Sequence, residues 1–200
     1  MNDTQDTTQD VRSEETKISF SVGLDFEFKN YTPKKLELLY YPSERLRNRN
    51  TNVETFDEDL EHLILDMFYT MRVNNGVGIA APQVGVHKRL SVLMFEQPLI
   101  LVNPVLVAKS KEMFTFEEGC LSVPGYFAEK QRPRFIRVAY QNEKGEQMEL
   151  SATELTAFCI LHEMDHLDGK LFVDDLSMLK RSRAKKKVKD TLRSRTLSLS

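Results

Sequence analysis

The sequence predicts an α+β fold in which antiparallel or mixed strands pack around a central helix with the motif His-Glu-x-x-His, followed by a C-terminal helix. Three patterns predict this fold: an amphipathic helical pattern that starts near residue 55, short apolar runs between residues 90 and 150, and an apolar helical stripe that contains two histidines. Consecutive strands that are followed by a buried helix are typical of the α+β class.

The composition limits the classes of protein that fit. A length of 200 residues suits one domain, and 40% hydrophobic with 29% charged residues excludes global disorder. No run of 18 apolar residues is present, which excludes a transmembrane helix, and two cysteines are too few for a disulfide scaffold. Residues 1–17 are acidic and lack an apolar stretch, so we expect a disordered leader rather than a targeting signal. A cytoplasmic location and a single domain over 18–195 follow as expectations.

The first helix is expected over 55–74. Thr55 and Glu58 have the spacing of a capping box, and Asn74, Asn75 and Gly76 end the pattern. Six apolar residues recur at helical spacing and predict one core-facing stripe: Leu60, Leu63, Ile64, Met67, Phe68 and Met71.

Four apolar segments are expected to form strands, and the last two flank a hairpin-like turn over 143–146. These segments are 90–95, 99–102, 135–141 and 147–150.

A second helix is expected to begin near Ser151, which has capping-box spacing to Glu154. A third helix is expected over 176–195, with sparse apolar positions. The segment from Lys180 to Arg195 contains nine basic residues and one acidic residue, a local charge of +8. The rest of the chain must therefore carry a charge of −10 to give the net charge of −2. Such a segment suits an acidic partner such as RNA, and a solvated helix face has the same pattern.

The segment 162–166, His-Glu-Met-Asp-His, is the strongest indication of chemistry. Histidines at i and i+4 on a helix can bind one metal ion, and Glu163 is placed to take a proton from water. Two helical histidines could also occur by chance. However, His162 and His166 continue the apolar stripe, where histidines without a partner would be costly to bury.

A catalytic site of this kind needs a third protein ligand. Phe172 stands where one class of zinc protease has its third histidine, and no glutamate follows Glu163 for the other class. Cys159 lies seven residues before His166 on the same helix, about 10 Å along its axis, so both cannot reach one ion. Cys120 is therefore the predicted ligand, and Cys159 a core or pocket residue.

The glycine-rich segment 76–83 fits a dinucleotide fingerprint only literally, because it follows a helix and precedes a strand. Such a segment can instead lay its backbone along an extended substrate. Gln83 at its end offers amide donors to an oxyanion.

The three segments GVGIAAPQ (76–83), EGCLS (118–122) and HEMDH (162–166), in this order, resemble the signature motifs of bacterial-type peptide deformylases. The resemblance extends over most of the chain, from about Leu38 to Lys189. It implies a metal-dependent hydrolase that removes the formyl group from the N-terminal formylmethionine of nascent polypeptides and releases formate.

The resemblance also implies residue roles. Cys120, His162 and His166 would bind the metal, Glu163 would act as general acid and base, and Gln83 with the Leu121 N–H would stabilise the oxyanion. Glu118 and Arg132 match a pair that braces the metal loop. Residues that would line the substrate cleft are Val77, Gly78, Leu155, Phe158 and Cys159, with Phe127 where close relatives often have a substrate-facing arginine.

The cofactor and partners follow from the same resemblance. It implies ferrous iron, whereas a Cys-His-His ligand set alone is more common for zinc, and purified protein could hold zinc or nickel. The expected partners are formylmethionyl peptides and, through the basic C-terminal helix, the ribosome, with no membrane and no DNA. Two alternatives are a zinc endopeptidase with the same helical motif, and a non-catalytic RNA-binding protein whose structural metal would need a fourth ligand such as His62 or His87.

Overall fold

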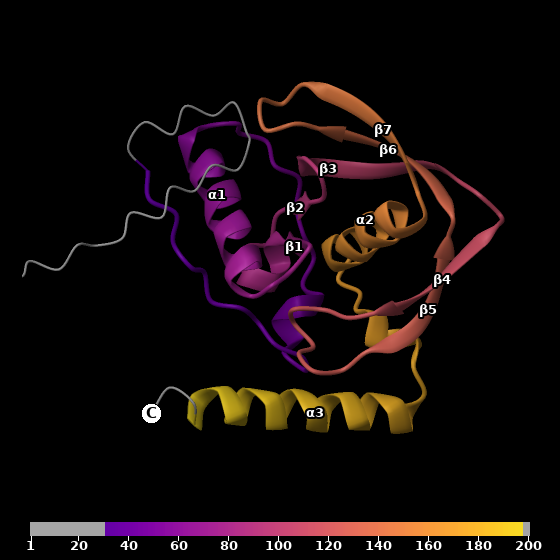
Figure 1. Ribbon diagram of the computed structural model, residues 1–200. Coiled ribbons are helices and arrows are strands. Elements are labelled where there is room, and N and C mark those ends of the chain that lie inside the picture. Colours follow the sequence, from indigo (N-terminus) through magenta and orange to yellow (C-terminus); the bar gives the residue numbers. More distant parts are fainter. Residues whose placement is uncertain (1–30, 198–200) are drawn as a thin grey trace, which may run out of the picture.

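An antiparallel five-stranded sheet with a helix on each face forms the body of the molecule (Figure 1). The computed structural model describes residues 31–197, so the leader expected over 1–17 lies outside the described residues. The helices are α1 (Glu58–Val73), α2 (Glu154–Leu167) and α3 (Met178–Leu197), with short 3₁₀ turns η1 (Glu44–Arg47), η2 (Ala81–Val84) and η3 (Phe172–Asp175). The strands are β1 (Gly78–Ala80), β2 (Leu90–Met94), β3 (Pro98–Lys109), β4 (Met113–Glu118), β5 (Ala128–Pro133), β6 (Phe135–Gln141) and β7 (Gln147–Thr153).

The strands form two sheets. The larger sheet has the order β1-β2-β3-β6-β7, and β4 pairs only with β5 in a separate two-stranded sheet. Every pairing between these named strands is antiparallel. The expected α+β class with a central motif-bearing helix and a C-terminal helix is confirmed.

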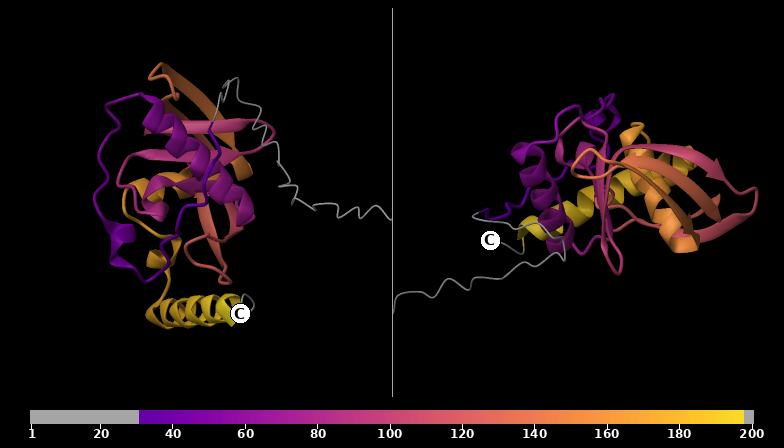
Figure 2. Two further views of the ribbon diagram at one scale, coloured as in Figure 1. Left: turned by 90° about the vertical axis from the view of Figure 1, so that its left-hand side faces the viewer. Right: turned by 90° about the horizontal axis from the view of Figure 1, so that it is seen from above.

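Strand β2 is buried on both sides because α1 and α2 cover opposite faces of the sheet (Figures 1 and 2). Leu90 and Val92 pack with the apolar stripe of α1 in one core cluster. Leu93, which points to the other face, packs with Ala157 and Ile160 of α2 in a second cluster. This arrangement explains why all four residues 90–93, Ser91 included, are buried rather than alternately buried and exposed.

The cap predicted for α1 is wrong. The helix starts at Glu58, and the side chain of Asp57 accepts a hydrogen bond from the Leu60 N–H at 3.1 Å. Thr55 lies before this cap. At the other end, Asn75 adopts a left-handed conformation with φ of 57° after the helix ends at Val73.

The predicted start of α2 is also wrong. Ser151 belongs to strand β7, where it pairs with Arg137 of β6, so the strand extends three residues beyond the predicted end. The helix begins at Glu154, whose N–H donates to the Arg134 carbonyl at 2.7 Å. Long-range pairing with β6 overrides the capping-box spacing.

Helix α3 lies along one side of the molecule, below the other elements in Figure 1. It begins at Met178, two residues later than predicted. Leu176 is the C-cap of η3, and the Ser177 carbonyl accepts a hydrogen bond from the Arg181 N–H. Ala184 and Val188 are buried against the third core cluster, whereas the nine basic residues of 180–195 are all exposed.

No helix among residues 31–197 is long and apolar enough to cross a membrane.

Candidate metal centre and active-site cavity

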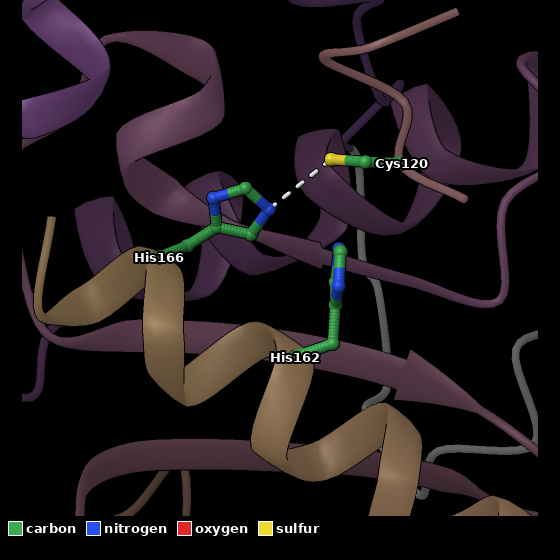
Figure 3. A group of neighbouring side chains, drawn as sticks. All are labelled: Cys120, His162 and His166. Carbon is green, nitrogen blue, oxygen red and sulfur yellow. Dashed lines mark hydrogen bonds between the residues drawn. The ribbon is translucent and has the colours of Figure 1, made fainter. Parts of the chain in front are cut away.

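Helix α2 brings two histidine rings to one side of its buried face. His162 and His166 are four residues apart, so their rings stand one turn apart with centroids separated by 4.9 Å. They are 8% and 1% exposed. Both rings point away from the helix toward the loop after β4 (Figure 3). The helix therefore positions two imidazoles in a buried environment, as the stripe pattern predicts.

The third donor comes from the segment between β4 and β5. Cys120 lies two residues after the end of β4, and its Sγ is 3.2 Å from Nε2 of His166 (Figure 3). Ligand atoms of Cys120, His162 and His166 all lie within 4.8 Å of one another, the one such group of three in the described part of the chain. A sulfur and two imidazole nitrogens at this spacing fit a divalent transition metal, with room left for a further ligand.

The protonation of the two histidines differs because of their neighbours. Burial, reinforced by the charge of His162, lowers the pKa of His166 well below its ordinary value. Burial also opposes protonation of His162, but the Cys120 sulfur and the carboxylate of Glu118 outweigh burial and raise its pKa. A neutral imidazole such as that of His166 is the form that binds a metal.

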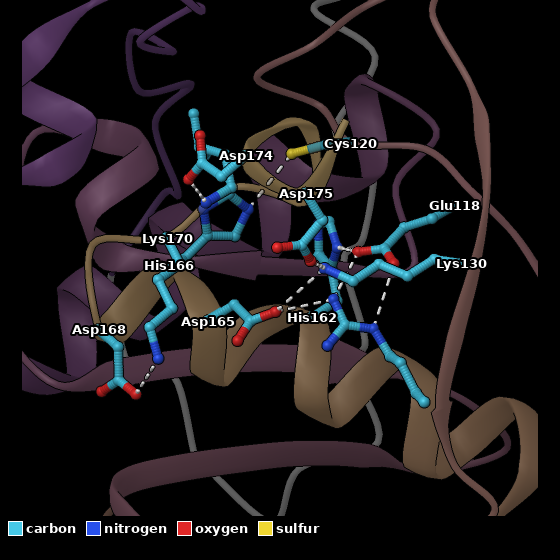
Figure 4. A network of polar contacts seen from close by, with 12 residues as sticks. Glu118, Cys120, Lys130, His162, Asp165, His166, Asp168, Lys170, Asp174 and Asp175 are labelled. Atoms are coloured by element: carbon cyan, nitrogen blue, oxygen red, sulfur yellow. Dashed lines mark hydrogen bonds and ion pairs between the residues drawn. The ribbon is translucent and has the colours of Figure 1, made fainter. Parts of the chain in front are cut away.

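A buried ion pair holds His162 in place (Figure 4). Glu118 contacts Nδ1 of His162, which leaves Nε2 for a metal, and also accepts two hydrogen bonds from Arg132 at 2.7 and 3.1 Å. Burial would raise the pKa of Glu118, but the bonds from His162 and Arg132 lower it to about 2. Arg132 also forms an ion pair with Asp165. Lys130 forms ion pairs with Asp165 and with the exposed Asp175.

Glu163 lies beside the donor group with one unsatisfied oxygen. It is 3% exposed, and its buried Oε2 has no hydrogen-bond partner among residues 31–197. Burial raises the pKa of Glu163 to about 7, partly offset by His162. Gly78 of β1 lies directly against it, since a Cβ atom there would collide with the carboxylate. A buried carboxylate with a free oxygen is suited to exchange a proton with a ligand in the cavity.

Gln83 in η2 is fixed by bonds at both ends of its amide. Its Oε1 accepts from the Ala80 N–H at 2.8 Å, and its Nε2 donates to Ser122 Oγ at 3.1 Å and lies 3.5 Å from Cys120 Sγ. The Leu121 N–H, next along the chain from Cys120, makes no hydrogen bond within residues 31–197. Two donors thus lie close to the cysteine. They come from the two segments that the sequence singled out.

The predicted site residues line one cavity of about 510 Å³. Five of the predicted catalytic and metal-binding residues line it: Gln83, Cys120, Leu121, His162 and Glu163. His166 is not among the residues that line the cavity. The six residues expected to contact substrate also line it: Val77, Gly78, Phe127, Leu155, Phe158 and Cys159.

Phe116 and Arg195 are among the cavity residues that the sequence did not assign to the site. Phe116 of β4 packs edge-on against Phe158 with ring centroids 5.7 Å apart, and Arg195 reaches the cavity from α3. The alternation Phe114-Thr115-Phe116 places both phenylalanines on one face of β4, but it is too short to predict which face points inward. Arg195 was part of a charge run, although its spacing of seven residues from Val188 could have placed it on the inner face of the helix.

The alternative ligands lie elsewhere. Phe172 is 2% exposed in an apolar cluster, so its position supplies no donor. His62 stacks on Tyr31 and His87 contacts Asn48, so neither completes a four-ligand structural site. Burial raises the pKa of Cys159 to about 11, which keeps its thiol protonated.

Comparison with known proteins gives one consistent result. The model of the polypeptide deformylase family matches residues 35–182. The peptide deformylase of Tolumonas auensis is 47% identical over 162 residues, which cover 79% of this chain and 96% of the relative. That of Azotobacter vinelandii is 45% identical over 157 residues, covering 76% and 94%.

Solved structures agree with the sequence relatives. A peptide deformylase from Legionella pneumophila is 44% identical with a TM-score of 0.78, covering 81% of this chain and 98% of the other. The enzyme from Ehrlichia chaffeensis in complex with actinonin is 40% identical with a TM-score of 0.76, covering 79% and 98%. These similarities lend no support to an endopeptidase.

Proposed function

The chain belongs to the peptide deformylase family, and from this premise we propose which residues carry out the reaction. The protein is a hydrolase that removes the N-formyl group from nascent polypeptides, as part of N-terminal processing during protein biosynthesis. The family is metal-dependent, and Cys120, His162 and His166 form a group that could bind the metal. The convergence of these three donors with Glu163 beside one cavity is the observation that carries the assignment of roles.

Cys120, His162 and His166 would hold one divalent ion. We propose ferrous iron, as the family resemblance implies, and zinc or nickel as ions that purified protein could hold instead. When bound, the ion supplies Lewis acidity, which lowers the pKa of water and polarises a carbonyl group. Glu118 supports this role because its contact with Nδ1 of His162 fixes the ring and directs the other nitrogen to the cavity.

Glu163 would move the proton of the reaction. Water adds its oxygen to the formyl carbon, Glu163 accepts the proton that water loses, and the carbon–nitrogen bond then breaks. Glu163 returns the proton to the leaving nitrogen, which yields formate and a free amino terminus. Its Oε2, which accepts no hydrogen bond from residues 31–197, supports this role, because Glu163 lines the cavity.

Gln83 and the backbone N–H of Leu121 would stabilise the oxygen that gains charge in the transition state. Donors of this kind contribute about 2.7–4 kcal/mol each. The bond between Gln83 Oε1 and the Ala80 N–H supports the role, because it leaves Nε2 as the end that faces Cys120.

The methionine side chain would enter the apolar part of the cavity. The buried Phe158 and the partly buried Cys159 of α2 form its inner wall, and Val77, Phe127 and Leu155 are about half exposed at its edge. Gly78 lies on β1, an edge strand of the sheet, whose open side could pair with an extended peptide.

We also propose that the protein works in the cytoplasm and binds the ribosome through α3. Nascent polypeptides emerge from ribosomes, and the basic residues of 180–195 are exposed to solvent. Phosphates of ribosomal RNA would neutralise such a helix and release counterions. The competing interpretation, a solvated helix face, predicts no effect of these charges on ribosome binding.

Formate release from a formyl-Met peptide tests the proposed function. Purified protein loaded with ferrous iron under anaerobic conditions should release formate, and actinonin, present in the Ehrlichia chaffeensis structure, should inhibit it. Glu163→Ala should keep the metal and lose about 10²–10⁴-fold in kcat. Normal turnover in this variant would assign the proton transfer to another group.

Metal analysis of two cysteine variants tests the ligand assignment. Cys120→Ala should lose both metal and activity, because a ligand is removed. Cys159→Ala is the matched control and should retain its metal, since its protonated thiol only lines the cavity. Full metal occupancy in Cys120→Ala would disprove the assignment.

A further inference from the structure

The last turn of α3 reaches the same cavity that contains the metal donors. Arg195 lines this cavity together with Cys120, Leu121 and Glu163, although it is 32 residues beyond Glu163 in the sequence. We propose that Arg195 is a specificity-determining residue that binds a carboxylate of the peptide substrate at the cavity mouth. This inference rests on the proposed function and adds a substrate preference to it.

The direction of Arg195 follows from the buried stripe of α3. Ala184 and Val188 are 0% and 2% exposed and pack against the body of the protein. Each helical residue advances by about 100°, so Arg195 lies within about 20° of Ala184 around the helix, whereas Arg193 lies about 180° away. Arg195 therefore extends the inner face of α3, and Arg193 is on its outer face.

Contacts at Gly125 hold this end of α3 against the loop that carries Cys120. Gly125 has a positive φ of 75°, and a Cβ atom built there would lie 2.6 Å from Oγ1 of Thr191 and 3.3 Å from Cε of Lys187. Thr191 is one turn before Arg195 on the inner face. The loop between β4 and β5 thus contacts α3 closely, one turn before Arg195.

The charge of Arg195 has no acidic partner in the described part of the chain. No acidic side chain within residues 31–197 forms an ion pair with it, so its five N–H donors are available to a ligand. The other ionisable groups of the cavity wall are the buried Glu118, His162 and Glu163, the partly buried thiols of Cys120 and Cys159, and the exposed Glu117. Arg195 is therefore the exposed cation of the cavity among the described residues.

A carboxylate is the substrate group that matches this cation. The formylated amino terminus is uncharged, so a peptide in the cavity carries negative charge only on acidic side chains or on its C-terminal carboxylate. Both sources offer two oxygens that a guanidinium can bind together. Exposed apolar side chains of Val77, Phe127 and Leu155 line the same mouth and offer no competing hydrogen bonds.

The test compares matched peptides on four proteins. The proteins are the full-length iron-loaded enzyme, Arg195→Ala, Arg195→Lys and, as the outer-face control, Arg193→Ala. One series of amidated formyl-Met peptides carries aspartate or asparagine at the second, third or fourth position. A second pair differs only in a free or amidated C-terminus, which separates the two sources of carboxylate.

We expect the unmodified enzyme to show a lower KM for a carboxylate-bearing peptide, by up to about fivefold for an exposed ion pair, with kcat unchanged. Arg195→Ala should lose this difference, Arg195→Lys should keep part of it, and Arg193→Ala should keep all of it. Salt should weaken it by screening.

The ratio of KM for acidic peptides to KM for neutral peptides is compared between Arg195→Ala and the unmodified enzyme. If the two proteins give the same ratio and turnover is intact, the role of Arg195 is overturned and the proposed function still stands. An equal loss in Arg193→Ala would also overturn the role of Arg195, because the effect would then be one of general charge. Failure of the unmodified enzyme to release formate from any formyl-Met peptide would instead overturn the proposed function, and this inference with it.

Discussion

The contact between Gly78 and Glu163 controls the position of the proposed general base. A methyl group at Gly78 would overlap the Glu163 carboxylate, so Gly78→Ala must displace it. Misplacement of a catalytic group by about 1 Å can cost about 10²-fold in rate. We expect Gly78→Ala to lower kcat by about this factor while metal content stays normal, as measured by formate release and metal analysis.

A double variant separates this effect from a general disturbance of β1. If the loss comes from the carboxylate, Gly78→Ala added to Glu163→Ala should reduce kcat little further, because the displaced group is already absent. Multiplied losses in the double variant would show that Gly78 acts through the substrate or through the strand instead.

Arg132 is expected to matter far more for stability than Arg134, two residues along the chain. Both arginines contact two carboxylates, but the side chain of Arg132 is 6% exposed and that of Arg134 is 44% exposed. Arg132→Met leaves Glu118 buried without its guanidinium, which should cost about 3–5 kcal/mol. Arg134→Met should cause little change, because its ion pairs are screened by solvent.

Urea unfolding of both variants with the same metal load measures this difference. Equal free energies of unfolding for Arg132→Met and the unmodified protein would show that the buried pair does not stabilise the metal loop.

The residues of the site could be predicted to different degrees. Cys120 followed from the count of ligands, because two histidines were fixed and the geometry of one helix excluded Cys159. The contact of Glu118 with Arg132 required the pairing of β4 with β5, which no local spacing reveals. Arg195 was hidden in a run of like charges, where only its helical phase distinguishes it from its neighbours.

The start of α1 gives a test at the level of one element. Asp57 accepts a hydrogen bond from the Leu60 N–H, whereas Thr55, the predicted cap, precedes the helix. Asp57→Ala should therefore lower the free energy of unfolding by about 1 kcal/mol, the usual value of an N-cap. Thr55→Ala is the matched control and should have little effect in the same urea titration. A larger loss of unfolding free energy in Thr55→Ala than in Asp57→Ala would support the predicted capping box instead.

The predicted starts of α1 and α2 failed for different reasons, a local cap in one case and distant strand pairing in the other. Spacing of Ser or Thr to Glu occurs before both α1 and α2, yet Asp57 caps the first and β7 continues through Ser151 before the second. Strands β4 and β5 were missed because they form a separate two-stranded sheet in which polar residues outnumber apolar ones and few residues are buried. By contrast, the apolar stripes of α1 and α2 identified both helices, since each packs on the sheet along its whole length.

At the scale of the whole molecule, α3 has two faces with different expected partners. Its inner face contains the buried Ala184 and Val188 and, at the cavity, Arg195. Its outer face carries basic residues that are exposed to solvent. Removal of the whole helix would expose apolar residues of the body and would confuse the two roles. Substitutions on the outer face alone keep the core contacts intact and isolate the proposed binding to the ribosome.

Lys186, Lys189 and Arg193 lie about 140–200° from Ala184 around the helix and define this outer face. Replacing all three with glutamine should weaken ribosome binding and reduce the slope of log affinity against log salt by about two, since each phosphate contact contributes about 0.7–0.9. Hydrolysis of short formyl-Met peptides should stay normal, because the cavity and Arg195 are unchanged. Sedimentation with ribosomes across a salt series measures the slope. If the triple variant sediments like the unmodified protein at every salt concentration, the outer face is only a solvated surface and the ribosome is bound elsewhere or not at all.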